Sequence, residues 1–317
     1  MSLAVLPALL VSVIGLAGVV VLALLLIRRA DPAPSEAAEA ARRHGSVVNL
    51  TAWLVWFLLP GPVMLVVAVG VFRASVGTGQ YAGVVTALYP ATHGLLFLTV
   101  HAIGERTWPR PAGPVRRAAL TPRRVADVAP RHLRAVSWAW VGLLVVALAV
   151  GGATAAPDGR SFIATGVGPT SPFPGWYYGA WLLPAALIVL GASEAVLRLV
   201  AARPAIVDAD PAYDAASRRL SAHRVLRGPQ LVLGLTLAGV VFVLGYGPHH
   251  AGLPAIGYAL DVLAIGVALA SLVLAVIPAQ PPLGAAQPPG GTLAALAPAP
   301  TGSSQTTAAA DGTDSSS

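Results

Sequence analysis

Long apolar runs alternate with short segments that hold almost all of the charged residues of this chain. A membrane-spanning helix needs about 20 mostly apolar residues, because each residue advances about 1.5 Å across about 30 Å of hydrocarbon. Seven runs suit this role, over residues 3–27, 47–72, 81–103, 136–153, 176–200, 230–246 and 254–277. The pattern therefore predicts an all-α fold, a polytopic membrane bundle of about seven transmembrane helices.

The two ends of the predicted bundle need separate interpretation. The first run, 3–27, has no positive charge before it and two arginines after it, so we interpret it as a retained anchor and not a signal peptide. The apolar stretch 228–277 is too long for one helix, and we divide it at residues 247–250. Residues 278–317 are mostly Pro, Ala, Gly, Ser and Thr, which predicts a disordered cytoplasmic tail after a transmembrane domain over 1–277.

Arginine is distributed unequally between the predicted loops. The chain has 20 basic residues and no lysine among them, and 18 lie in or beside the segments 28–46, 104–134 and 201–227. The opposite side holds only Arg73 and Arg160. Because basic residues in short loops stay cytoplasmic, this asymmetry predicts an N-terminus outside and a C-terminus inside.

The composition agrees with a membrane protein and changes the meaning of the net charge. Apolar residues make up 56% of the chain and charged residues 10%, against about 25% in a typical soluble domain. The net charge of +7 suggests a nucleic-acid partner at first. Arginines beside a membrane are attracted by anionic headgroups, however, so we expect the lipid bilayer and its anionic lipids as partners, other membrane proteins as an alternative, and no nucleic acid.

The largest basic segment is the candidate contact for lipids or partners. Thr121-Pro122 is a plausible helix start within it, and its candidate contact residues are Arg116, Arg117, Arg123 and Arg124. In the next basic segment three aspartates precede three arginines, an order that the helix dipole favours, so we expect a short cytoplasmic helix from about Pro211.

Few polar residues lie inside the predicted spans, and these form the candidate intramembrane site. His93 is expected either to hydrogen-bond within the bundle or to handle protons, and Asp261 to be a cation or proton site or a capped carboxylate near the interface. Pro60, Pro62 and Pro184 fall near mid-membrane, as does Pro90, and proline-broken helices at one depth can form a transporter site.

Several kinds of site are excluded or disfavoured. There is no cysteine for thiol chemistry and no lysine for a retinal Schiff base. His93 and His101 share one span and cannot chelate one haem iron, and His249-His250 with Asp158 makes a weak metal site. Phosphate-binding, metalloprotease and hydrolase motifs are absent from the sequence. We therefore expect no catalytic, metal or cofactor-binding residues, and we interpret Glu194 and Arg198 as an i, i+4 ion pair at the interface.

One segment carries a resemblance. The run from Glu105 through Trp108, Arg116-Arg117 and Thr121-Pro122 to Pro130, with the arginine-only, alanine-rich composition, resembles multi-pass membrane proteins of unknown function from high-GC actinobacteria. The resemblance covers this loop and its flanking spans. It implies a cell-membrane location and no particular activity.

Two hypotheses about function follow. The first is a non-enzymatic membrane component that interacts with partners or anionic lipids through the basic segment 105–134. The second is a small permease or ion-coupled transporter with a midplane site near the prolines and His93, coupled through Asp261. A membrane-embedded enzyme would need a catalytic set that the sequence does not offer.

Overall fold

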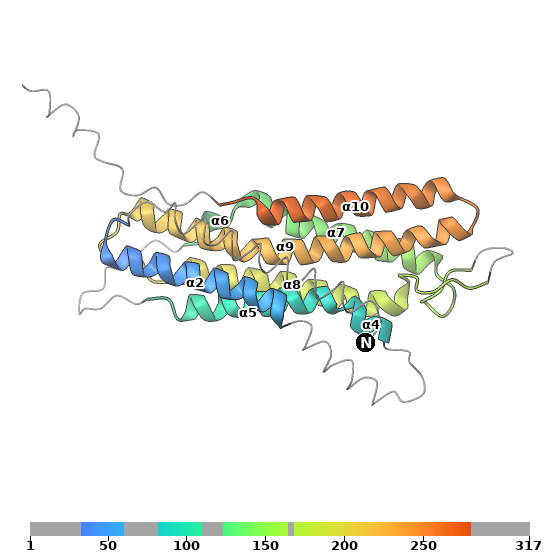
Figure 1. Ribbon diagram of the computed structural model, residues 1–317, viewed down its shortest axis with the longest axis horizontal. Helices are drawn as coiled ribbons and strands as arrows, with labels where there is room; N and C mark the ends of the chain where they lie inside the picture. Colours follow the sequence, from blue (N-terminus) through green and yellow to red (C-terminus); the bar gives the residue numbers. More distant parts are fainter. Residues whose placement is uncertain (1–32, 60–81, 110–122, 164–167, 280–317) are drawn as a thin grey trace, which may run out of the picture. The chain divides into compact units, whose positions relative to one another are not determined.

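The computed structural model describes residues 33–59, 82–109, 123–163 and 168–279, which belong to one compact unit over Met1–Gly284. Within these ranges the chain is helical, and its β-structure consists of an isolated bridge between Phe162 and Thr170. The helices, labelled in Figure 1, are α2 (Glu36–Leu58), α4 (Ala82–Ala87), α5 (Tyr89–Arg106), α6 (Val125–Val128), α7 (Arg131–Thr154), α8 (Trp176–Ala202), α9 (Pro211–His250) and α10 (Pro254–Val276).

Four of these helices, α7 to α10, are long and apolar enough to cross a membrane. The all-α class is therefore confirmed, and the chain has the character of a helical membrane protein. The number of seven spans and the orientation of the termini remain predictions. The first predicted span, Pro60, Pro62 and the tail from residue 280 lie outside the described residues.

Local sequence explains where several helices begin. The Ser35 hydroxyl accepts a hydrogen bond from the Ala38 amide at the start of α2, and the Asp210 carboxylate accepts one from the Ala212 amide at the start of α9. Pro254 occupies the first turn of α10, where its missing amide hydrogen costs nothing. These caps explain why the helices begin at these residues.

The largest departure from the predicted elements is α9. The expected helix start at Pro211 is present, but that helix is not short: it continues through the predicted sixth span to His250 as one helix of 40 residues. The third predicted span is interrupted at Leu88, between α4 and α5, and Pro90 lies in the first turn of α5. A helix interruption therefore adjoins Pro90, as expected for a proline that breaks a helix.

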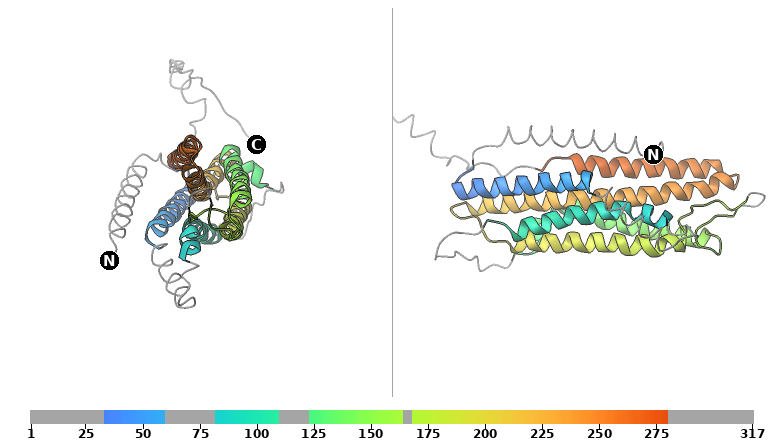
Figure 2. Two further views of the ribbon diagram at one scale, coloured as in Figure 1. Left: turned by 90° about the vertical axis from the view of Figure 1, so that its right-hand side faces the viewer. Right: turned by 60° about the horizontal axis from the view of Figure 1, so that its bottom comes forward.

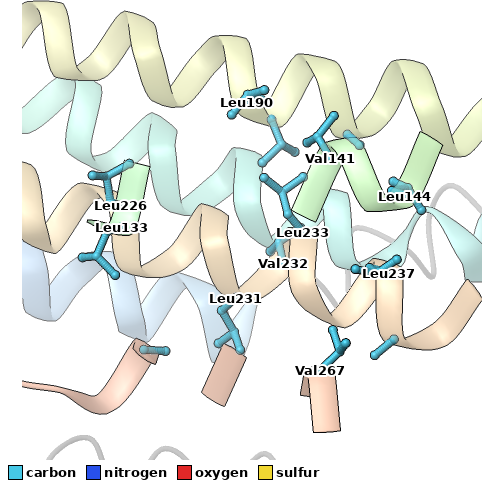
Figure 3. Close-up of a cluster of buried hydrophobic side chains, with 14 of the residues drawn as sticks. Leu133, Val141, Leu144, Leu190, Leu226, Leu231, Val232, Leu233, Leu237 and Val267 are labelled. Atoms are coloured by element: carbon cyan, nitrogen blue, oxygen red, sulfur yellow. The ribbon is translucent and has the colours of Figure 1, made fainter. Parts of the chain in front are cut away.

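The core is arranged around α9. Of its most apolar stretch, 61% is buried, compared with 28% for α7 and 22% for α10. Figure 3 shows Leu226, Leu231, Val232, Leu233 and Leu237 of α9 among side chains of neighbouring helices. The second half of α9 runs beside α10, and both views in Figure 2 show this pairing. A second, smaller apolar cluster includes Ala38, Trp108, Ile206 and Tyr213.

Candidate functional site: an arginine-rich end of the bundle

The three arginine-bearing segments of the sequence meet at one end of the bundle, which we call the basic end. The His44 Nε2 atom of α2 donates a hydrogen bond of 2.9 Å to the Gly104 carbonyl at the end of α5. Beyond α8, Arg203 reaches Glu105. Arg227 of α9 donates from Nε to the Ala275 carbonyl near the end of α10. Contacts between these segments support the prediction that they share one side of the membrane.

A buried ion pair lies at the centre of the basic end. The Arg203 Nη1 atom is 3.5 Å from Glu105 Oε2, and both side chains are almost fully inaccessible. The Arg203 guanidinium lies over the Trp108 ring, 3.7 Å from its centroid, and donates to the hydroxyls of Ser217 and Ser221. The cation therefore has several partners in place of water.

Burial shifts the pKa values of both members of this pair. It lowers the pKa of Arg203 to about 10, against the opposing attraction of Glu105. It also raises the pKa of the Glu105 carboxyl, because the loss of hydration outweighs the attraction of Arg203 and its neighbours. Arg203 nevertheless stays a cation at neutral pH.

A second buried arginine is held beside the first. The Arg218 Nε atom lies 3.0 Å from Asp214 Oδ2, and Nη1 donates to the carbonyls of Val200 and Ala201 at the end of α8. Arg123 reaches the same Asp214 carboxylate at 3.4 Å. These bonds fix the segment after α8 to the start of α9, and they use the carbonyls that a helix end leaves without partners.

A small pocket, open to solvent on one side, lies between α2, α5 and α9 at this end. Its lining residues are His44, Gly45, Val48, His101, Gly104, Glu105, Trp108, Ser221 and Arg224. The His101 side chain is buried, and its Nε2 atom has no hydrogen-bond partner among the described residues. Two basic side chains, Arg224 and His101, thus border the same space.

Exposed arginines surround the basic end on its outside. In the described part of the chain, the exposed arginines without an ion-pair partner include Arg106, Arg124, Arg131, Arg198 and Arg219. They lie near the ends of different helices. These exposed arginines differ from the buried Arg203 and Arg218, which are paired with carboxylates.

Two of the four predicted lipid-contact arginines can be located. Arg123 is used in the pair with Asp214, and Arg124 is exposed beside α6, where its amide donates to Asp127 Oδ2 at 2.8 Å. Arg116 and Arg117 lie outside the described residues, as does the proposed helix start at Thr121-Pro122. Their role in binding lipids or partners stays a prediction.

The predicted intramembrane site is only partly described, and no described contact joins its members. The His93 Nδ1 atom is 2.9 Å from the Tyr89 carbonyl, and its ring packs against Trp56. Pro184 lies inside α8 as expected, but it is exposed. Asp261 is near the start of α10, where its carboxylate lies 3.0 Å from His249 Nε2. With Pro60 and Pro62 outside the described residues, the midplane transporter site remains a prediction.

Two other sequence interpretations change. Glu194 pairs with Arg134 of α7 at 2.7 Å and accepts from the Trp138 indole, so the expected partner Arg198 is replaced by a side chain from another helix. Asp158 accepts hydrogen bonds from the amides of Arg160 and Ser161 in its own loop. Its carboxylate is therefore engaged in a turn and is not directed at His249 and His250.

Comparison with known proteins adds no identity. No family model, no curated protein and no solved structure matches this chain.

No motif in the sequence indicates the pocket by itself. Two spacings would have indicated it: His101 and Glu105 are four residues apart on α5, and Ser217, Ser221 and Arg224 follow one another at helical spacing on α9. Each spacing places polar side chains on one face of a helix. That the two faces meet, with His44 beside them, depends on packing between segments far apart in the chain.

Proposed function

We propose that this protein is a non-enzymatic membrane component that binds anionic lipid headgroups at its basic end, with that end facing the cytoplasm. The observation that carries the proposal is the position of three exposed arginines. Arg106, Arg131 and Arg198 each continue an exposed apolar helix face at its end.

The helical spacing supports this arrangement. Arg106 follows Ile103 by three residues on α5, and Arg131 precedes Trp138 by seven on α7. Arg198 follows Leu187 by eleven on α8, about three turns. The apolar members, Ile103, Leu187 and Trp138, are about half exposed. An apolar face suits lipid chains, and an arginine at its end suits the phosphate layer.

The charge balance also favours lipids. Peripheral arginines without carboxylate partners add attraction to an anionic leaflet, worth about 1 kcal/mol for each residue near the surface. Two buried arginines of the same end are paired with carboxylates, Arg203 with Glu105 and Arg218 with Asp214. The exposed set is instead available to headgroups at the surface of the bundle.

Lipid retained by the purified protein tests the proposal. The full chain is extracted in mild detergent, and the bound phospholipids are identified by mass spectrometry. We expect the wild type to retain anionic over zwitterionic lipids, and the triple variant R106Q/R131Q/R198Q to lose that preference. R160Q, which changes an exposed arginine at the opposite end of the described bundle, is the matched control and is expected to behave as wild type.

Two outcomes would contradict lipid binding. Equal lipid composition in the wild type and the triple variant would show that these arginines do not select headgroups. A protein partner that co-purifies with the wild type and is lost from the triple variant, without a change in lipid, would favour protein docking instead.

A further inference from the structure

The pocket between α2, α5 and α9 holds a cation that the protein leaves without a counter-charge. The Arg224 guanidinium has neither a carboxylate within 4.0 Å nor a hydrogen-bond partner among the described residues. Its neighbours Arg203 and Arg218 each have a carboxylate partner and at least one hydrogen-bond partner. Arg224 is partly buried, and a charge that loses part of its water is stabilised by an opposite charge beside it, so Arg224 is the cation of this pocket that can accept an anion.

The side chains around Arg224 are positioned to receive an anion. A Cβ atom on Gly45 would lie 3.2 Å from Arg224 Nη1, so the absence of a side chain there lets the guanidinium lie against α2. His101 is 3% exposed, and its Nε2 atom borders the pocket without a partner. The Ser221 hydroxyl accepts from Arg203 and keeps its own hydrogen to donate.

Glu105, the one carboxylate among the lining residues, does not make the net charge of the pocket negative. Glu105 is paired with Arg203, which leaves Arg224 as the excess charge of the pocket. A guanidinium offers two parallel N–H donors, a geometry that matches two oxygens of one phosphate group. The N–H of the His101 imidazole and the Ser221 hydroxyl would add single donors.

We propose that this pocket binds one phosphate group, with Arg224 as its principal ligand and His101 and Ser221 as supporting donors. The group belongs either to a lipid headgroup that enters from the membrane side or to a free phosphate compound. The site uses residues distinct from Arg106, Arg131 and Arg198, so it goes beyond the proposed function, and either proposal can fail while the other holds.

Thermal unfolding of the full chain in detergent tests the site, with unfolding temperature measured against increasing ligand. The probes are inorganic phosphate and a short-chain phosphatidic acid, with chloride at matched ionic strength and short-chain phosphatidylcholine as references. A ligand that binds only the folded state raises the unfolding temperature in a saturable way. We expect at least one phosphate probe to do so at concentrations where its reference does not.

The response to the two probes identifies the source. Stabilisation by inorganic phosphate indicates a free phosphate compound, and stabilisation by phosphatidic acid alone indicates a headgroup. Equal effects of each phosphate probe and its reference would overturn the proposal.

Variants distinguish binding at this pocket from a general effect of charge on stability. R224Q is expected to raise the concentration of the active probe needed for half-maximal stabilisation by about tenfold or more. R224K keeps the charge but loses the paired donors, so it is expected to weaken binding as well. R219Q, an exposed arginine on the same helix outside the pocket lining, is the control.

A second position keeps the test decisive if R224Q fails to fold. H101L removes the imidazole and leaves Arg224 in place, and it is expected to weaken the same response. Wild-type affinity in R224K or R224Q, or in H101L if the Arg224 variants do not fold, would overturn the proposal.

Discussion

The His249 Nε2 atom lies 3.0 Å from Asp261 Oδ2, and this contact joins the end of α9 to the start of α10. Two glycines give the pair its room. A Cβ atom on Gly257 would lie 2.6 Å from the His249 ring, and one on Gly245 would lie 2.8 Å from Asp261 Oδ1. The carboxylate that the sequence singled out as an intramembrane suspect thus has a partner across the helical hairpin.

Loss of this contact should weaken the hairpin. We expect H249A to lower the free energy of unfolding by about 1 kcal/mol, because Asp261 loses its described hydrogen-bond partner. Unfolding in detergent, followed by circular dichroism, measures the change. H250A alters the exposed adjacent histidine and should stay within about 0.5 kcal/mol of wild type. An equal loss in both variants would show that the contact has no special weight.

The Glu105 carboxyl should make stability depend on pH. Its pKa in the folded protein is raised by burial above the ordinary value of 4.5. At pH values above 4.5, the Glu105 carboxyl of the unfolded chain loses its proton. In the folded protein the same carboxyl stays protonated until the pH exceeds its raised pKa. The folded state therefore binds more protons in this window, and stability falls as pH rises through it.

The comparison with E105Q isolates this effect, because glutamine does not titrate. The free energy of unfolding of the wild type, minus that of E105Q, should decrease as pH rises from about 4.5. The buffers contain no phosphate, so that ligand binding in the pocket does not contribute to the measured stability. E36Q removes an exposed carboxyl of α2 and should preserve the wild-type pH dependence. If the free energies of unfolding of the wild type and E105Q change equally with pH, the interpretation of Glu105 is wrong.

Close packing between α9 and α10 should make one glycine of α9 far more sensitive than another. A Cβ atom on Gly234 would lie 1.8 Å from Ser271 Oγ, whereas one on Gly239 would meet no atom within 4 Å. We expect G234A to destabilise the protein by about 1–3 kcal/mol through overpacking. G239A should be neutral or stabilise it by up to about 1 kcal/mol, since alanine favours the helix. Chemical denaturation in detergent compares them, and equal stabilities would contradict the described packing.

Sequence patterns predicted the structural features that depend on residues close together in the chain. The apolar runs gave the helical class, and Asp210 before Pro211 gave the start of α9. They did not show that this helix continues into the predicted sixth span, because the charged segment and the apolar run were treated as separate elements, and the structure passes through Pro229 between them. A proline inside a helix removes one hydrogen bond, and close packing around α9 can offset that loss.

Contacts between distant segments were beyond prediction. The i, i+4 spacing of Glu194 and Arg198 reports only what one helix places on its own face, and the actual partner, Arg134, is 60 residues away in α7. The pocket is similar, because His44, His101 and Arg224 meet only after α2, α5 and α9 pack. A single sequence contains the residues of this site without the distances between them.

The continuity of α9 has a mechanical consequence. At about 1.5 Å per residue its 40 residues extend about 60 Å, so one helix carries both Arg224 at the basic end and His249 at the far turn. Arg224 and His249 are 25 residues apart on this helix, so about 37 Å of one continuous element joins the pocket to the contact with α10.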